Sequence, residues 1–310
     1  MSSLRKIGRD HLAADLAQLE RLIAKLTDED VMMRFGLEER RDELRAEMQG
    51  LDEEQDTTAS AALFFGGRPV IGGIGIESEF GGRAVATFQD LIAKQYTDLT
   101  VGLGQRGVVP NKAATRMHIT SVVRGSFGFL LEELVTQPAL LDTPLKEAVD
   151  GVSDLMGAFH DDDEEKFQLA AESLDERVLA TARDFFSLLR QEGATFRIVA
   201  GDSDRSFDAL SIDRAAERAS LTTLEDDEEA LEGVLAGVLP DGHLFEYRTQ
   251  GERGIIGGRA DKSIPSENLA ALNRDWLERP SRAVVKTRKV LKSGELVRES
   301  FTLMRIIGRD

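Results

Sequence analysis

The sequence predicts an α+β protein with an N-terminal helical hairpin, a central mixed α/β body and a C-terminal small β-barrel. Three observations support this prediction. Apolar residues near the start recur with helical spacing, glycine-punctuated strand and helix patterns alternate in the middle, and strand patterns dominate the last part. The pattern changes place domains at 1–55, 61–222 and 230–310. A chain of 310 residues with 41% hydrophobic residues is long enough for more than one core.

The N-terminal segment, residues 8 to 50, reads as two amphipathic helices separated by a break at Thr27–Asp30. Three- and four-residue steps put the apolar side chains of the first helix on one face. This stripe can dock on the chain's own body or contact a second copy, and the sequence leaves both possibilities open. The predicted oligomer-contact residues are Leu12, Leu16, Leu19, Ile23 and Leu26.

The central segment begins with a strand at Ala61–Phe65, and Gly66–Gly67 predicts a turn into a returning strand at 68–71. A helix over 82–96 follows. After a glycine-rich loop, the stretch 117–134 predicts a hairpin, because β-branched residues precede an alternating apolar run.

Mainly helical sequence follows the predicted hairpin. Thr143–Pro144 is typical of a helix start, and the acidic Asp161–Asp163 begins a second, short helix. Gly193 closes a third helix, as glycine often does after a helix C-terminus. A strand at Thr195–Val199 and a helix at Ile212–Ala219 complete the central domain.

The acidic run Glu225–Glu229 is interpreted as a domain boundary, and strand patterns follow it. Pro240–Gly242 predicts a turn, and residues 266–277 form one short helix. Strands at 283–291 and 296–307 pair across a tight turn. About five short strands with one helix favour an SH3-like or OB-like barrel.

Composition excludes several classes of chemistry. The absence of cysteine rules out disulfides, thiolate zinc sites, iron–sulfur clusters and a cysteine nucleophile. A net charge of −17 disfavours general affinity for nucleic acid. No apolar run is long enough to span a membrane, and none follows the basic N-terminus as in a signal peptide. We therefore expect a cytoplasmic protein without a membrane partner.

No motif predicts a catalytic residue, a metal site or a cofactor. The acidic cluster 160–165 cannot converge on one ion, because neighbouring helical residues point about 100° apart. It is better interpreted as a charged helix start. The four histidines lack ligand spacing, and His118, beside the predicted hairpin, is the best single candidate. The glycines of 72–76 and 102–107 match no phosphate-binding motif, and 125–128 matches no hydrolase motif.

The last 30 residues are basic within an acidic chain. From 281 to 310, eight Lys and Arg against three Asp and Glu give a local net charge of +5. A basic barrel face could bind single-stranded nucleic acid, or these cations could protect strand edges or match acidic residues of the same chain. The candidate nucleic-acid contacts are Arg282, Lys286, Arg288, Lys289, Lys292 and Arg298.

Two short segments carry a resemblance to known sequences. Phe65–Ile71, followed by a helix and then by Arg124–Phe129, resembles segments of uncharacterised bacterial proteins, some of which are linked to anti-phage defence. The likeness covers residues 61–147. It implies an accessory, sensing or assembly component of a bacterial system, and it implies no catalytic residue.

The leading functional prediction is a non-enzymatic adaptor or assembly protein. Its N-terminal helices would supply a homo-oligomer contact, and its barrel would bind a protein partner. The first alternative is a nucleic-acid-binding module that uses the basic barrel face. The second alternative is an enzyme that holds a small ligand with the glycine loops of 72–82 and 102–107.

Overall fold

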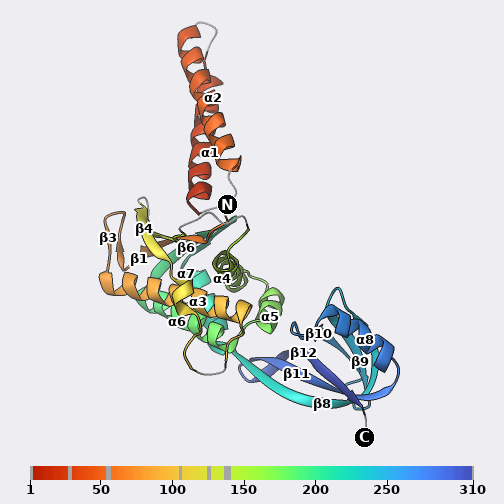
Figure 1. The fold of residues 1–310 in the computed structure, drawn as a ribbon. Helices are drawn as coiled ribbons and strands as arrows, with labels where there is room; N and C mark the ends of the chain where they lie inside the picture. The colour runs from red at the N-terminus through yellow and green to blue at the C-terminus, as the bar shows by residue number, and fades with distance from the viewer. Residues whose placement is uncertain are drawn as a thin grey trace. The chain divides into compact units, whose positions relative to one another are not determined.

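The computed structural model describes residues 3–26, 30–53, 57–104, 107–123, 127–135 and 141–308 (Figure 1). It confirms the predicted α+β class and the closed C-terminal barrel. The chain divides into two compact units. The first comprises Met1–Asp161 with Arg177–Ala219, and the second comprises Asp162–Glu176 with Ser220–Asp310.

The first unit begins with two long helices, α1 (Ser3–Ile23) and α2 (Val31–Glu53), which lie side by side (Figure 1). An ion pair between Arg45 Nη2 of α2 and Glu20 Oε1 of α1, 2.8 Å long, joins them. Most of the break predicted between the helices, residues 27–29, lies outside the described residues.

An antiparallel sheet with the strand order β4-β5-β1-β6-β7 forms the centre of the first unit. The predicted hairpin of 117–134 is confirmed as β4 and β5, although its turn at 124–126 lies outside the described residues. The edge strand β7 was not expected from the sequence. The strands are β1 (Ser60–Gly67), β4 (His118–Val123), β5 (Phe127–Glu132), β6 (Ala194–Ala200) and β7 (Ser203–Phe207).

The turn predicted at Gly66–Gly67 is wrong. β1 continues through both glycines and pairs with β6, so the chain does not return along β1. A β-carbon on Gly67 would lie 2.4 Å from the carbonyl oxygen of Gly193, and its φ is +83°. Glycine is therefore needed at this position, because β1 and the start of β6 approach each other closely. The following strand, β2 (Val70–Ile71), pairs instead with β3 (Gly75–Ile76).

Helices pack on one face of this sheet through an aromatic core. The Phe65 ring of β1 lies 5.5 Å from Phe80 of α3, and Phe185 of α6 lies 5.1 Å from Phe196 of β6. The opposite face carries a smaller apolar cluster around Phe64, against which Ile7 of α1 packs. The helices are α3 (Ser78–Thr100), α4 (Pro144–His160), α6 (Glu176–Glu192) and α7 (Ala209–Leu221).

Several local predictions in this unit are confirmed. The Thr143 hydroxyl caps α4 by accepting a hydrogen bond from the Lys146 amide, and Gly193 follows α6 with a φ of +58°. The glycine-rich loop is shorter than predicted. Helix α3 runs on to Thr100, and a short 3-10 helix, η1 (Lys112–Thr115), occupies the loop's far end.

The second unit is a closed five-stranded barrel with the order β10-β12-β11-β8-β9, in which parallel pairing of β10 with β12 completes the closure. The strand number and the helix α8 (Ser266–Trp276) agree with the prediction. The strands β8, β11 and β12 are longer than expected. The strands are β8 (Thr222–Leu239), β9 (Leu244–Thr249), β10 (Ile255–Ala260), β11 (Pro280–Lys292) and β12 (Glu295–Gly308).

The acidic run Glu225–Glu229 is not a boundary segment. It lies inside β8, where it pairs along its whole length with the basic part of β11. Opposite charges across an antiparallel pair stabilise it, so five consecutive acidic residues can form a strand here. The second unit also includes α5 (Glu164–Glu172), which contacts β11 and β12. As predicted, an acidic residue starts α5: the Asp163 carboxylate accepts a hydrogen bond from the Glu165 amide at 2.9 Å.

Candidate functional site

The helices α1 and α2 leave much apolar surface uncovered. Among their described side chains, Leu44 alone is buried, at 3% exposure. Leu19, Leu22 and Leu44 line a small hollow of about 240 Å³ between the helices, together with the polar side chains of Asp15, Gln18 and Arg40. The residues predicted as oligomer contacts are all half-buried: Leu12, Leu16, Leu19, Ile23 and Leu26.

The first turn of α2 adds larger exposed groups. Met32, Met33 and Phe35 are 85%, 61% and 67% exposed, and they fall within four consecutive residues. Single exposed apolar side chains are common, but a group of three with half-buried leucines nearby on the same helix pair is typical of an interaction surface. The predicted contact residues all lie on the first helix, so Met32, Met33 and Phe35 were not among them, although Met33 belongs to the apolar pattern of the second helix.

The cations proposed for nucleic-acid binding are mostly engaged within the barrel unit. Arg288 holds Asp226 of β8 in a two-bond ion pair of 2.6 and 2.8 Å, and Lys286 contacts the same carboxylate at 2.7 Å. Arg282 contacts Glu232 at 3.1 Å. Lys289 lies opposite Glu225 in the strand register.

Helix α5 engages the remaining cations of this set. Lys292 contacts Glu164 at 2.6 Å, at the start of the helix, and Arg298 pairs with Glu172 at its end. Arg288 also donates a hydrogen bond to the Leu174 carbonyl at 2.8 Å. Cations at a helix C-terminus are stabilised by the helix dipole. Five of the six candidate cations, all in described residues, are therefore paired within the same unit.

The pKa of Asp226 reflects this pairing. Burial alone would raise the pKa, but hydrogen bonds from Arg288 and Lys286 outweigh it and lower the pKa from 3.8 to about 2. The carboxylate thus stays charged at physiological pH. A nucleic-acid phosphate near Arg288 would meet this charge and the other carboxylates of β8, which disfavours binding there.

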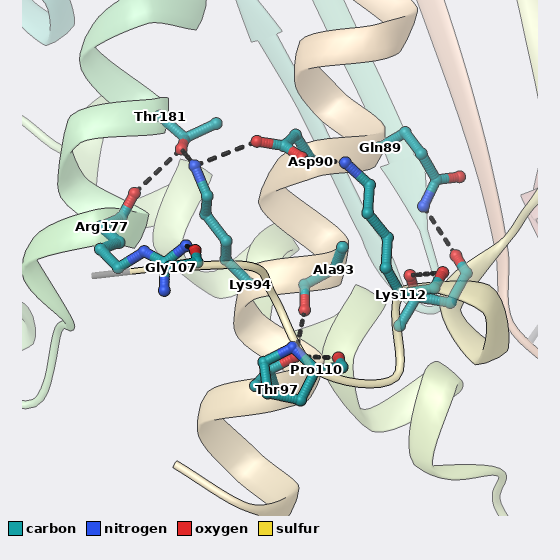
Figure 2. A network of polar contacts seen from close by, with 11 residues as sticks. Gln89, Asp90, Ala93, Lys94, Thr97, Gly107, Pro110, Lys112, Arg177 and Thr181 are labelled. Atoms are coloured by element: carbon teal, nitrogen blue, oxygen red, sulfur yellow. Dashed lines mark hydrogen bonds and ion pairs between the residues drawn. The ribbon is translucent and has the colours of Figure 1, made fainter. Parts of the chain in front are cut away.

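Side chains of α3 and α6 hold the described parts of the glycine loop, residues 101–104 and 107–117 (Figure 2). Gln89 of α3 donates to the Thr115 carbonyl at 2.6 Å and accepts from the Met117 amide at 3.0 Å. Arg177 of α6 donates to the carbonyls of Gly104 and Gly107 at 3.0 and 2.8 Å. The arrangement closes the loop onto α3 and α6.

A lysine–aspartate–lysine cluster lies in the same network (Figure 2). Asp90 contacts Lys94 at 3.0 Å and Lys112 at 2.7 Å, and Lys94 also donates to the Thr181 hydroxyl. Burial opposes the charge on Asp90, but the hydrogen bonds from the two lysines lower its pKa. Both lysines are thus committed to structural ion pairs, and neither is placed as a free nucleophile or base.

The other candidate features of the sequence do not come together. His118 is exposed on the edge strand β4, and His160 contacts the Ser206 carbonyl at 3.1 Å. Within the described ranges, no three His, Asp or Glu side chains gather closely enough to hold a metal ion. The glycines of 72–76 form the β2–β3 turn. In the part of the chain that the structure describes, no helix is both long and apolar enough to cross a lipid bilayer.

No protein-family model, no curated protein and no solved structure matches this chain.

Proposed function

We propose that the chain is a non-enzymatic assembly protein that forms homo-oligomers through α1 and α2. The proposal rests on how few side chains these two helices bury. Two helices of 21 and 23 residues bury a single described side chain, Leu44.

One buried leucine is a weak basis for a stable helix pair. Its burial contributes about 2 kcal/mol. Ordering each backbone residue opposes folding by about 1–2 kcal/mol before hydrogen bonds are counted. Most helix stability in proteins comes from packing an apolar face. A second copy would supply that packing by covering the half-buried leucines together with Met32, Met33 and Phe35. In this proposal α1 and α2 form a helical hairpin, and two hairpins associate into a bundle.

In the same proposal, the barrel is the part of the chain that binds a protein partner. Its closed form and strand number are those expected of SH3-like or OB-like barrels, and its paired cations favour a protein over a nucleic acid. The earlier resemblance to bacterial segments linked to anti-phage defence suits an accessory component in the cytoplasm.

The direct test is the double substitution Leu16→Asp with Ile23→Asp. Two charges in the proposed contact would be buried without partners, so the oligomer should dissociate to a monomer of 34.1 kDa. Native mass by light scattering reads this out, and circular dichroism checks that the protein is still folded. Leu210→Asp is the matched control, because Leu210 is 76% exposed on α7 and should leave the mass unchanged. A folded double variant with the parental mass would contradict the proposal.

A further inference from the structure

Helix α4 packs against the edge strand β7. A β-carbon on Gly201, just before β7, would lie 3.2 Å from Asp150 Oδ1 of α4. Seven residues further along α4, a β-carbon on Gly157 would lie 2.6 Å from Cζ of Arg205 in β7. Between these two contacts Ser153 falls on the same side of α4, and Ser203 shares a strand face with Arg205. This spacing places the two serines and the arginine along the same α4–β7 interface.

All three of these residues carry buried polar atoms that lack a partner. Among the described residues, Ser153 Oγ, Ser203 Oγ and Arg205 Nε have no hydrogen-bond partner. Ser153 is only 2% exposed. Most buried polar groups in native proteins are hydrogen-bonded, so three orphans at one interface need an explanation. Leaving each one unsatisfied destabilises the fold.

Arg218 is an example of a buried arginine whose hydrogen bonds stabilise the fold. Arg218 is 5% exposed and donates to the carbonyls of Ala158 and Phe159, both at 3.3 Å, where α4 ends. Arg205 makes no such contact. Its guanidinium lies against Gly157, where the missing β-carbon leaves room for it.

Two acidic side chains near the three orphans already have cationic partners. Asp150 is the acidic side chain that reaches this interface at Gly201, and Lys146 already contacts it at 3.0 Å. The adjacent acid of β7, Asp204, is held by Arg197 at 2.7 Å. Two hydroxyl donors and the Nε donor of Arg205 remain without a partner. An oxyanion with several oxygens can accept from all three at once, and hydrogen bonds between charged groups are the stronger ones.

We propose that Ser153, Ser203 and Arg205 form a binding site for a phosphate group. The site is independent of the assembly surface on α1 and α2. The phosphate can be free or part of a small metabolite, because either presents the same oxygens to the three donors. Acetate, a planar carboxylate with two oxygens, should bind much more weakly.

The experiment measures the melting temperature of the full chain against inorganic phosphate, with sodium chloride holding the ionic strength constant. A ligand that binds the folded state raises the melting temperature in a saturable way. Glycerol phosphate and acetate are titrated in parallel. Arg205→Gln should weaken apparent phosphate affinity about tenfold or more, because it removes a charge-assisted contact. Arg205→Lys should recover part of it.

Ser153→Ala separates binding from a purely structural role. Without phosphate its melting temperature should equal or exceed that of the parent, because an unsatisfied buried hydroxyl has been removed. With phosphate it should gain less than the parent. Arg190→Gln is the matched control, since Arg190 of α6 is paired with Asp213 of α7 at 2.9 Å, and its response to phosphate should be unchanged.

The proposal is overturned if phosphate produces no saturable rise in the parent, or an equal rise in Arg205→Gln. An equal rise with acetate would overturn the assignment to phosphate. A stronger response to glycerol phosphate than to inorganic phosphate would support the site and identify a phosphate ester as its ligand.

Discussion

Single residues in the barrel show how its long strands are stabilised by charge. Asp226 accepts from Arg288 and Lys286, and these contacts hold its pKa at about 2. A carboxyl whose pKa is lower in the folded state contributes stability above its unfolded pKa of 3.8, and this contribution is lost as pH falls toward 2.

The sequence contains one tryptophan, Trp276 in α8, so its fluorescence reports on barrel unfolding alone.

Asp226→Asn should therefore remove part of the barrel's acid sensitivity. At pH 7 the substitution should cost on the order of 1 kcal/mol, after allowance for the partial exposure of the pair. The difference from the parent should disappear as pH falls from 4 to 2. Urea unfolding followed by Trp276 fluorescence across this range measures it. A constant difference at all pH values would mean that the ion pairs do not set the stability.

Gly258 of β10 sits where the barrel closes. A β-carbon there would lie 2.0 Å from the Phe301 carbonyl oxygen of β12, a distance that no relaxed structure allows. Gly258→Ala should therefore open the β10–β12 pairing and lower the melting temperature seen by Trp276 fluorescence by several degrees. Gly257→Ala is the control, because its nearest atom would be at an ordinary 3.6 Å. Equal effects of the two substitutions would argue against this closure.

At the scale of elements, side chains of α3 and α6 decide the conformation of the glycine loop. Gln89 binds the backbone at Thr115 and Met117, and Arg177 binds it at Gly104 and Gly107. Such contacts replace the regular hydrogen bonds that a loop lacks. This is why a glycine-rich stretch without a phosphate motif need not be a ligand loop.

Gln89→Ala should release the far end of this loop. Hydrogen exchange of the Met117 amide should become faster, because its acceptor has been removed, while the core strand β6 keeps its protection. Exchange followed by mass spectrometry or NMR measures the change. Unchanged protection of Met117 would show that other contacts hold the loop.

Elements with local signals could be predicted from the sequence. The hairpin β4–β5, the Thr143 cap, the Gly193 helix end and the β11–β12 turn all depend on residues close in sequence. The failures depend on distant partners. Gly66–Gly67 resembles a turn because its partner strand β6 lies well over 100 residues away.

The same reason explains the errors in the candidate sites. The acidic run of β8 and the basic run of β11 each looked like an exposed feature, because only the fold places Asp226 opposite Arg288. The α4–β7 cluster has no sequence signal. Two serines and an arginine become notable only when their hydrogen bonds can be followed in three dimensions.

Across the whole molecule, the charged side chains of the barrel and the apolar side chains of α1 and α2 differ in how many of their possible contacts they make. The barrel's charges have partners within its own unit, whereas α1 and α2 leave leucines half-buried and the start of α2 exposed. An apolar contact between copies should survive salt, because screening weakens only the electrostatic part of an association. Bound nucleic acid, by contrast, should be released by salt.

Assembly through the N-terminal helices is best tested by the native mass of the purified protein, measured by light scattering in low and high salt. The 260/280 nm absorbance ratio is recorded on the same sample. We expect a salt-independent multiple of 34.1 kDa without nucleic acid, and we expect Leu16→Asp with Ile23→Asp to return the mass to a single chain. A monomeric parent, or one that carries nucleic acid released by salt, would contradict it.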